Sequence, residues 1–143
     1  MLLIDRDIFG QGDISIPPIT DADFEDNTQY AEKRIREYLP LVKSALGGKQ
    51  AKKLQTEMAQ YTSREAMDYI GGRDWKAIFD IILQIVCSAF IENQYRYSTP
   101  EFRKSLTADV LLEKCRILKL DNQVMVNVLN RCGYSEQAEK IAG

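Results

Sequence analysis

The stretch that decides the fold is WKAIFDIILQIVCSAFIENQYR, residues 75–96. Its apolar residues cover most of the circumference of a helix, so we expect neighbouring helices to surround it. The apolar run within it, residues 77–91, contains Asp80 and Gln84 and is shorter than the about 20 mostly apolar residues of a membrane span. The stretch therefore predicts a buried core helix, capped by Asp74, and no transmembrane segment. The apolar residues are Trp75, Ile78, Phe79, Ile81, Ile82, Ile85, Val86, Ala89 and Phe90.

A narrow polar stripe runs along the same segment. Lys76, Asp80, Gln84 and Ser88 are four residues apart and share one side of the helix. We expect this stripe to be a solvated edge, and the alternative is a polar seam against another subunit.

The chain before this helix also has helical periodicity. A first helix is expected to begin near residues 23–27 and to end at Gly47-Gly48, with Pro40 kinking or restarting it. A second helix is expected over residues 49–61, and a short third one from Ser63 to Ile70.

Four start signals follow the central helix. The sequence STPE at residues 98–101 has capping-box spacing with proline in the first turn. A helix over 107–119 comes next, then one capped by Asp121, then a short one from Ser135. The predicted fold is all-α: a small helical bundle with an extended N-terminal arm (1–22) and a single helical domain (23–143). Within that domain we distinguish a core bundle (23–97) from a C-terminal set of short helices (98–143).

Charge divides the chain in the same way. Residues 1–29 carry seven acids and one base, a net charge of −6, which leaves +4 for the rest of a chain of net charge −2. An arm of one sign and a body of the other suggest docking, either on the same chain or on a neighbouring copy.

The arm is also rich in large apolar residues, which require burial. Pro17 and Pro18 favour an extended conformation for its later part. The predicted interaction arm comprises Leu3, Ile4, Ile8, Phe9, Ile14, Ile16 and Ile19.

The sequence points away from enzymatic chemistry. It contains no histidine, which removes the commonest general base and zinc ligand. Cys87, Cys115 and Cys132 are widely spaced in apolar helical contexts, so we expect buried reduced thiols and a reducing cytoplasm. The N-terminal apolar run is too short for a signal peptide. We expect no catalytic residue, no cofactor and no metal site.

A basic patch lies near the Gly47-Gly48 turn. It consists of Lys43, Lys49, Lys52 and Lys53. A solvated face is the simplest interpretation, and a receptor for an acidic arm or for nucleic-acid phosphates is the alternative. Tyr95 and Tyr97 beside Arg96 could stack on bases, although a pI of about 5.3 removes the usual electrostatic reason to propose DNA binding.

The order of these segments resembles a known family. The acidic stretch DADFEDN at residues 21–27 precedes Ala31-Glu32, Ile35 and Tyr38-Leu39, and the later apolar helix contains AFIEN at residues 89–93. This pattern is similar to the small head–tail connector (neck or adaptor ring) proteins of tailed bacteriophages, over roughly residues 19–97. The spacer at 49–73 and the C-terminal helices are longer than is common in that family.

The resemblance implies a non-enzymatic structural protein in a virion. Copies would form a ring beside neighbouring structural proteins, with DNA close by but without sequence-specific contact, and would exchange N-terminal arms. Two other interpretations remain open: a monomeric helical adaptor that binds a protein partner, and a nucleic-acid-binding helical protein.

Overall fold

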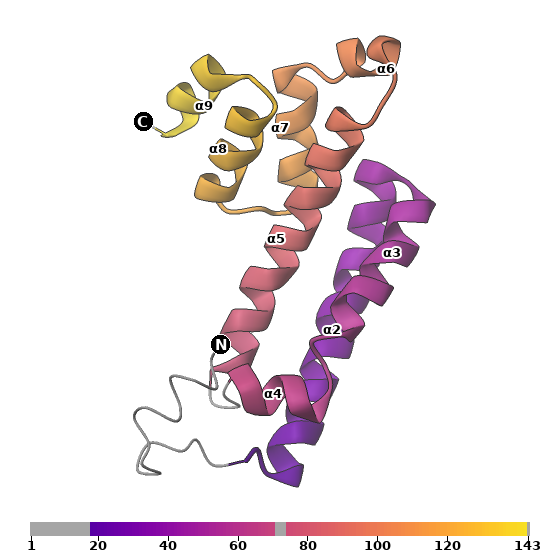
Figure 1. The fold of residues 1–143 in the computed structure, drawn as a ribbon, viewed down its shortest axis with the longest axis vertical. Helices are drawn as coiled ribbons and strands as arrows, with labels where there is room; N and C mark the ends of the chain where they lie inside the picture. The colour runs from indigo at the N-terminus through magenta and orange to yellow at the C-terminus, as the bar shows by residue number, and fades with distance from the viewer. Residues whose placement is uncertain (1–17, 71–73, 143) are drawn as a thin grey trace.

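The computed structural model describes residues 18–70 and 74–142 and consists of helices joined by short turns (Figure 1). The predicted all-α class is confirmed for these residues. Of the predicted interaction arm, Ile19 lies within them and the other six residues lie outside. The helices are α2 (Asp21–Leu46), α3 (Gly48–Ala59), α4 (Arg64–Ile70), α5 (Trp75–Arg96), α6 (Pro100–Ser105), α7 (Ala108–Ile117), α8 (Asn122–Arg131) and α9 (Ser135–Ala142).

Helix α2 begins earlier than the sequence predicted. Thr20 is its N-cap and accepts a hydrogen bond from the Asp23 N–H at 3.1 Å. The helix continues through Pro40, so the predicted restart there is wrong. It ends at Gly47, whose φ of 103° is a conformation that glycine adopts without steric cost.

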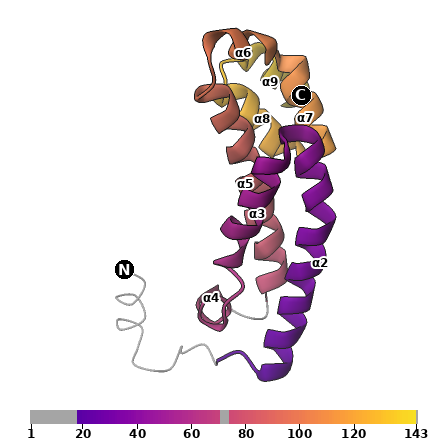
Figure 2. The same ribbon diagram turned by 90° about the vertical axis from the view of Figure 1, so that its right-hand side faces the viewer.

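The long helices form the body of the molecule. Helices α2 and α3 make an antiparallel hairpin on one side of α5, and α4 crosses the end where α2 begins (Figures 1 and 2). Helices α7 and α8 pack against the other end of α5, and α9 packs on α8. One end of α5 is therefore enclosed by more helices than the other.

The core follows one face of α5. Trp75, Phe79, Leu83, Cys87 and Ile91 are fully buried at four-residue spacing along it. The Trp75 and Phe79 rings stack with centroids 4.7 Å apart, and Trp75 Nε1–H donates to the Tyr61 carbonyl at 3.1 Å. Asp74 occupies the N-cap position of α5, but its side chain makes no capping hydrogen bond, so the predicted side-chain cap is wrong.

Side-chain contacts tie the short C-terminal helices to the body. The Arg103 guanidinium donates to the carbonyls of Tyr95, Arg96 and Ser98, where α5 ends. Lys114 Nζ on α7 donates to the Ala45 carbonyl in the last turn of α2, at 2.6 Å. The core cluster continues from α2 and α5 through α7 to α9, so residues 98–142 share one core with the long helices.

Among the described residues, no helix is both long and apolar enough to cross a membrane.

Candidate interface

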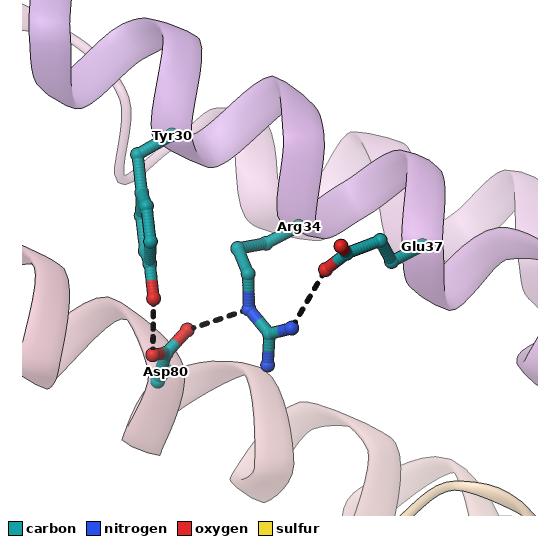
Figure 3. A network of polar contacts seen from close by, with 4 residues as sticks. All are labelled: Tyr30, Arg34, Glu37 and Asp80. Carbon is teal, nitrogen blue, oxygen red and sulfur yellow. Dashed lines mark hydrogen bonds and ion pairs between the residues drawn. The ribbon is translucent and has the colours of Figure 1, made fainter.

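The polar stripe of α5 faces α2. The Tyr30 hydroxyl donates to Asp80 Oδ2 at 2.5 Å, and Arg34 Nε donates to Asp80 Oδ1 at 3.0 Å (Figure 3). Arg34 also donates through Nη1 to Glu37 Oε1 at 2.7 Å. Both oxygens of Asp80 thus accept hydrogen bonds from α2, and these bonds fix the register between the two helices.

The stripe continues as an internal seam on either side of Asp80. Lys76 Nζ pairs with Asp26 Oδ2 at 2.6 Å, and Gln84 Oε1 accepts the Asp121 N–H at 2.8 Å. Ser88 is buried and donates to the Ile85 carbonyl. The stripe is partly solvated, as predicted for an edge, since the side chains of Lys76 and Asp80 are 42% and 34% exposed. It also joins α5 to other parts of its own chain.

The electrostatics of the seam agree with a structural role. Burial, followed by the bond to Asp80, raises the pKa of Tyr30, which keeps its hydroxyl protonated as a donor. Although burial opposes the charged form of Arg34, its bonds to Glu37 and Asp80 raise its pKa above the ordinary value. The guanidinium therefore remains charged and paired.

Trp75, Phe79 and Leu83 face the core, and the aliphatic residues two positions further on lie about 200° away around the helix, so they face outward. Successive residues of a helix are rotated by about 100°, so Ile81 and Ile85 lie a quarter turn from Asp80 and Gln84. Their side chains are 57% and 55% exposed. Ala77 is exposed as well, and Ile78 is partly buried. We call Ala77, Ile78, Ile81 and Ile85 the open face of α5.

The open face corrects one expectation. Neighbours were predicted to surround the whole of α5, but from residue 75 to residue 85 they cover only part of its circumference. The open face could have been suspected from the four-residue spacing of residues 77, 81 and 85, which places an apolar stripe beside the polar one. The sequence could not show which stripe α2 would cover.

The three thiols behave as predicted. Cys87, Cys115 and Cys132 are free and buried. Burial raises their pKa values to about 12, about 12 and about 11, so at neutral pH all three are protonated and poor nucleophiles. Within the described ranges, no three acidic, cysteine or histidine residues gather in a way that could hold a metal ion.

The acidic segment is paired with bases other than the predicted patch. Asp21 forms an ion pair with Arg64, and Asp26 pairs with Lys76. Ile19, the one described residue of the interaction arm, is buried, and its N–H donates to Asp68 Oδ1 on α4 at 2.7 Å. The root of the arm is therefore anchored on its own chain.

The basic patch is divided between two surfaces. Lys49 and Lys53 line a groove of about 780 Å³ between α3, the end of α5 and α6, whereas Lys43 and Lys52 lie outside it. All four lysines are exposed, and none forms an ion pair with any residue that the structure describes. The structure thus brings together two members of the patch, with Tyr97 and Phe102 on the other side of the groove.

Comparison with protein families, curated proteins and solved structures finds no match for this chain.

Proposed function

We propose that the protein is a non-enzymatic structural assembly subunit whose copies pack side by side through the open face of α5. The observation that carries the proposal is the exposure of Ile81 and Ile85 on the side of α5 that faces away from its buried residues, beside polar residues that are already paired within the chain. Full burial of an isoleucine side chain contributes roughly 1.5–3 kcal/mol. A partner that covers both side chains would therefore gain a substantial part of a binding free energy.

The chemistry of the face supports this choice. The four residues of the open face carry no charge and no side-chain hydrogen-bonding group. The core of a protein–protein interface is depleted of charged residues in the same way. The charged groups of this part of α5 are already paired with α2, so covering the face leaves no ion without a partner.

The most specific form of this proposal is a ring subunit of a phage head–tail connector. The resemblance over residues 19–97 supports it, because that range takes in α2 to α5 and therefore the whole open face. In this form the protein is part of a virion, its neighbours are other structural proteins, and DNA passes through the ring without sequence-specific contact. Helices α6 to α9 would be an addition to the common family plan.

Sedimentation of the full chain over a range of concentrations tests the proposal. We expect the parent protein to associate as its concentration rises and the double variant Ile81→Asp/Ile85→Asp to remain a monomer with an unchanged helical circular-dichroism spectrum. Val110→Asp is a matched control, because Val110 is 37% exposed on α7, away from the open face.

Cross-linking provides a second readout for weak association. A cysteine introduced as Ile85→Cys would be accessible, whereas the three native thiols are buried. We expect a bismaleimide to join copies of Ile85→Cys but not copies of Val110→Cys. A parent protein that stays monomeric at all concentrations and is not cross-linked at position 85 would favour the monomeric adaptor instead.

A further inference from the structure

We propose that the groove between α3, α5 and α6 receives residues 5–9 of the N-terminal arm of a second copy. The inference rests on the proposed assembly function and deepens it by naming a second contact between copies. This contact is separate from the open face of α5, since none of Ala77, Ile78, Ile81 and Ile85 lines the groove.

The groove has a basic wall, which also carries the acid Glu57, and an aromatic wall. Lys49 and Lys53 are one turn apart on α3 and have no ion-pair partner in the described part of the chain. Across from them, Tyr97 is 76% exposed and Phe102 is 44% exposed. Such a site suits an acidic segment that also carries an aromatic side chain.

One segment of the chain has this composition at the required spacing. In the sequence DRDIF, residues 5–9, an extended backbone would place Asp5, Asp7 and Phe9 on one side. The two carboxylates would then be about 6.6 Å apart along the chain. The side chains of Lys49 and Lys53, at positions i and i+4 of a helix, begin about 6 Å apart. Two ion pairs can therefore form together while Phe9 reaches the aromatic wall.

An unpaired buried acceptor in the groove points to a ligand with hydrogen-bond donors. Gln94 Nε2 donates to the Leu46 carbonyl at 3.3 Å, but the buried Gln94 Oε1 has no hydrogen-bond partner among the described residues. Buried polar atoms are normally paired. The backbone N–H groups of an extended peptide would supply the missing donor.

The geometry favours the arm of another copy. The arm leaves the body at Ile19, at the beginning of α2, whereas Gln94 and Lys49 lie near its end. The 26 residues of α2 span about 39 Å. The nine residues from Phe9 to Pro18 span at most about 32 Å. Asp5 and Asp7 lie further along the arm and could reach the lysines of their own copy, but Phe9 would fall short of Tyr97, which lies at the end of α5 beyond Gln94. The three contacts can therefore form together only with a neighbouring copy.

A labelled peptide of residues 1–17, titrated with the full chain at concentrations where the chain is monomeric, tests the proposal by fluorescence anisotropy. We expect Lys49→Glu/Lys53→Glu to weaken peptide binding at least tenfold. Lys43→Glu/Lys52→Glu is the matched control, because it makes the same change of charge outside the groove and should alter affinity less than about twofold. Tyr97→Ala should weaken binding without changing net charge.

Charge exchange between two full-length variants tests whether the arm acts on another copy. The arm variant Asp5→Lys/Asp7→Lys and the groove variant Lys49→Glu/Lys53→Glu should each lose the arm contact alone. A mixture should restore it, because each arm then meets a groove of opposite charge on the other chain. Restored association in the mixture supports the proposal, and a mixture that behaves as the sum of its components overturns it.

Three other results would overturn the proposal: no binding of the peptide, an equal loss in the Lys43/Lys52 control, or tighter binding of a single-stranded DNA 10-mer that the groove variant abolishes. The last would make the groove a nucleic-acid site. Failure of the assembly function is distinguishable, because the Ile81→Asp/Ile85→Asp chain should bind the peptide normally even if the open face plays no part in association.

Discussion

The two halves of α5 differ in how the rest of the chain covers them. From residue 86 to residue 92 no position is exposed, because α2 and α3 lie on one side and α7 and α8 on the other. From residue 75 to residue 85 the inward face is just as well buried, but every fourth residue from Ala77 onward is exposed. The same apolar composition therefore forms a core in one half and an available surface in the other.

In its first half α5 has three stripes: Trp75, Phe79 and Leu83 are fully buried, the polar stripe beside them is partly buried, and the open face is largely exposed. In the polar stripe, a lysine and an aspartate contact α2 and a glutamine accepts the Asp121 N–H, while Ile81 and Ile85 face outward. The core face packs against other helices and the polar stripe pairs with them, so the aliphatic stripe is the side of this half that stays uncovered.

The largest expected effect comes from truncating an isoleucine in each half. Ile91 is fully buried and Ile85 is 55% exposed. We expect Ile91→Ala to lower the free energy of unfolding by about 3 kcal/mol. The matched variant Ile85→Ala should lower it by less than about 0.5 kcal/mol in the monomer. Urea unfolding followed by Trp75 fluorescence measures the loss in each variant. Similar losses would show that the two halves of α5 do not differ in how much their isoleucines contribute to stability.

Alkaline pH should lower the stability of the protein through the buried thiol in the second half of α5 (residues 86–92). In the unfolded chain the thiols ionise near their ordinary pKa of 9.0, whereas the pKa of folded Cys87 is about 12. Between these values the unfolded state holds fewer protons, so stability is retained below pH 9 and falls as pH rises above it. One thiol accounts for up to about 1.4 kcal/mol per pH unit.

The variant Cys87→Ala isolates this contribution. Its unfolding free energy should decline less steeply above pH 9 than that of the parent, with Cys115 and Cys132 supplying the remaining slope. Identical slopes in the parent and the variant would show that the Cys87 thiol does not resist ionisation in the folded protein.

The polar seam of the first half should contribute less than the core does. Asp80→Ala removes the acceptor shared by Tyr30 and Arg34, and we expect a loss of about 1 kcal/mol because the site is partly solvated. A double-mutant cycle with Tyr30→Phe measures the coupling between the two helices directly. Zero coupling would mean that packing alone orients α5.

The rim of the same seam should contribute least. Glu37 pairs with Arg34 within α2, and its side chain is 47% exposed. We expect Glu37→Gln to cost about 0.3 kcal/mol or less, and the cost should shrink further in high salt. A loss as large as that of Asp80→Ala would show that the contact within α2, rather than the bridge to α5, fixes Arg34.

Most helix starts could be predicted from short sequence motifs, because a helix start depends on residues only a few positions apart. Helix α6 begins at Pro100 as predicted, but its cap is Thr99, which accepts the Phe102 N–H, instead of the predicted capping box of Ser98 and Glu101. Thr107 caps α7 by accepting the Val110 N–H. The start of α9 at Ser135 was also correct. Asp121 occupies the N-cap position of α8, but its side chain makes no capping bond.

Contacts between distant residues could not be predicted in this way. Asp80 meets Tyr30 and Arg34 from 50 and 46 residues away, and helical periodicity does not say which side of α5 will meet α2. The exposure of Ile81 and Ile85 depends on that same choice. The groove likewise required Lys49 and Lys53 to meet Tyr97, which follows from the packing of α3 on α5 rather than from any motif.

The bond from Lys114 to the last turn of α2 has a consequence for synthesis of the chain. Ala45 is synthesised 69 residues before Lys114, so its carbonyl cannot accept this hydrogen bond until α7 has been made. Translation proceeds at roughly 5–20 residues per second in the direction from α2 to α9. The α2–α3 hairpin is therefore synthesised several seconds before its contact with α7 can form. Until α7 and α8 have been made, the second half of α5 lacks the cover that they provide, and their arrival leaves the open face as the exposed aliphatic stripe of that helix.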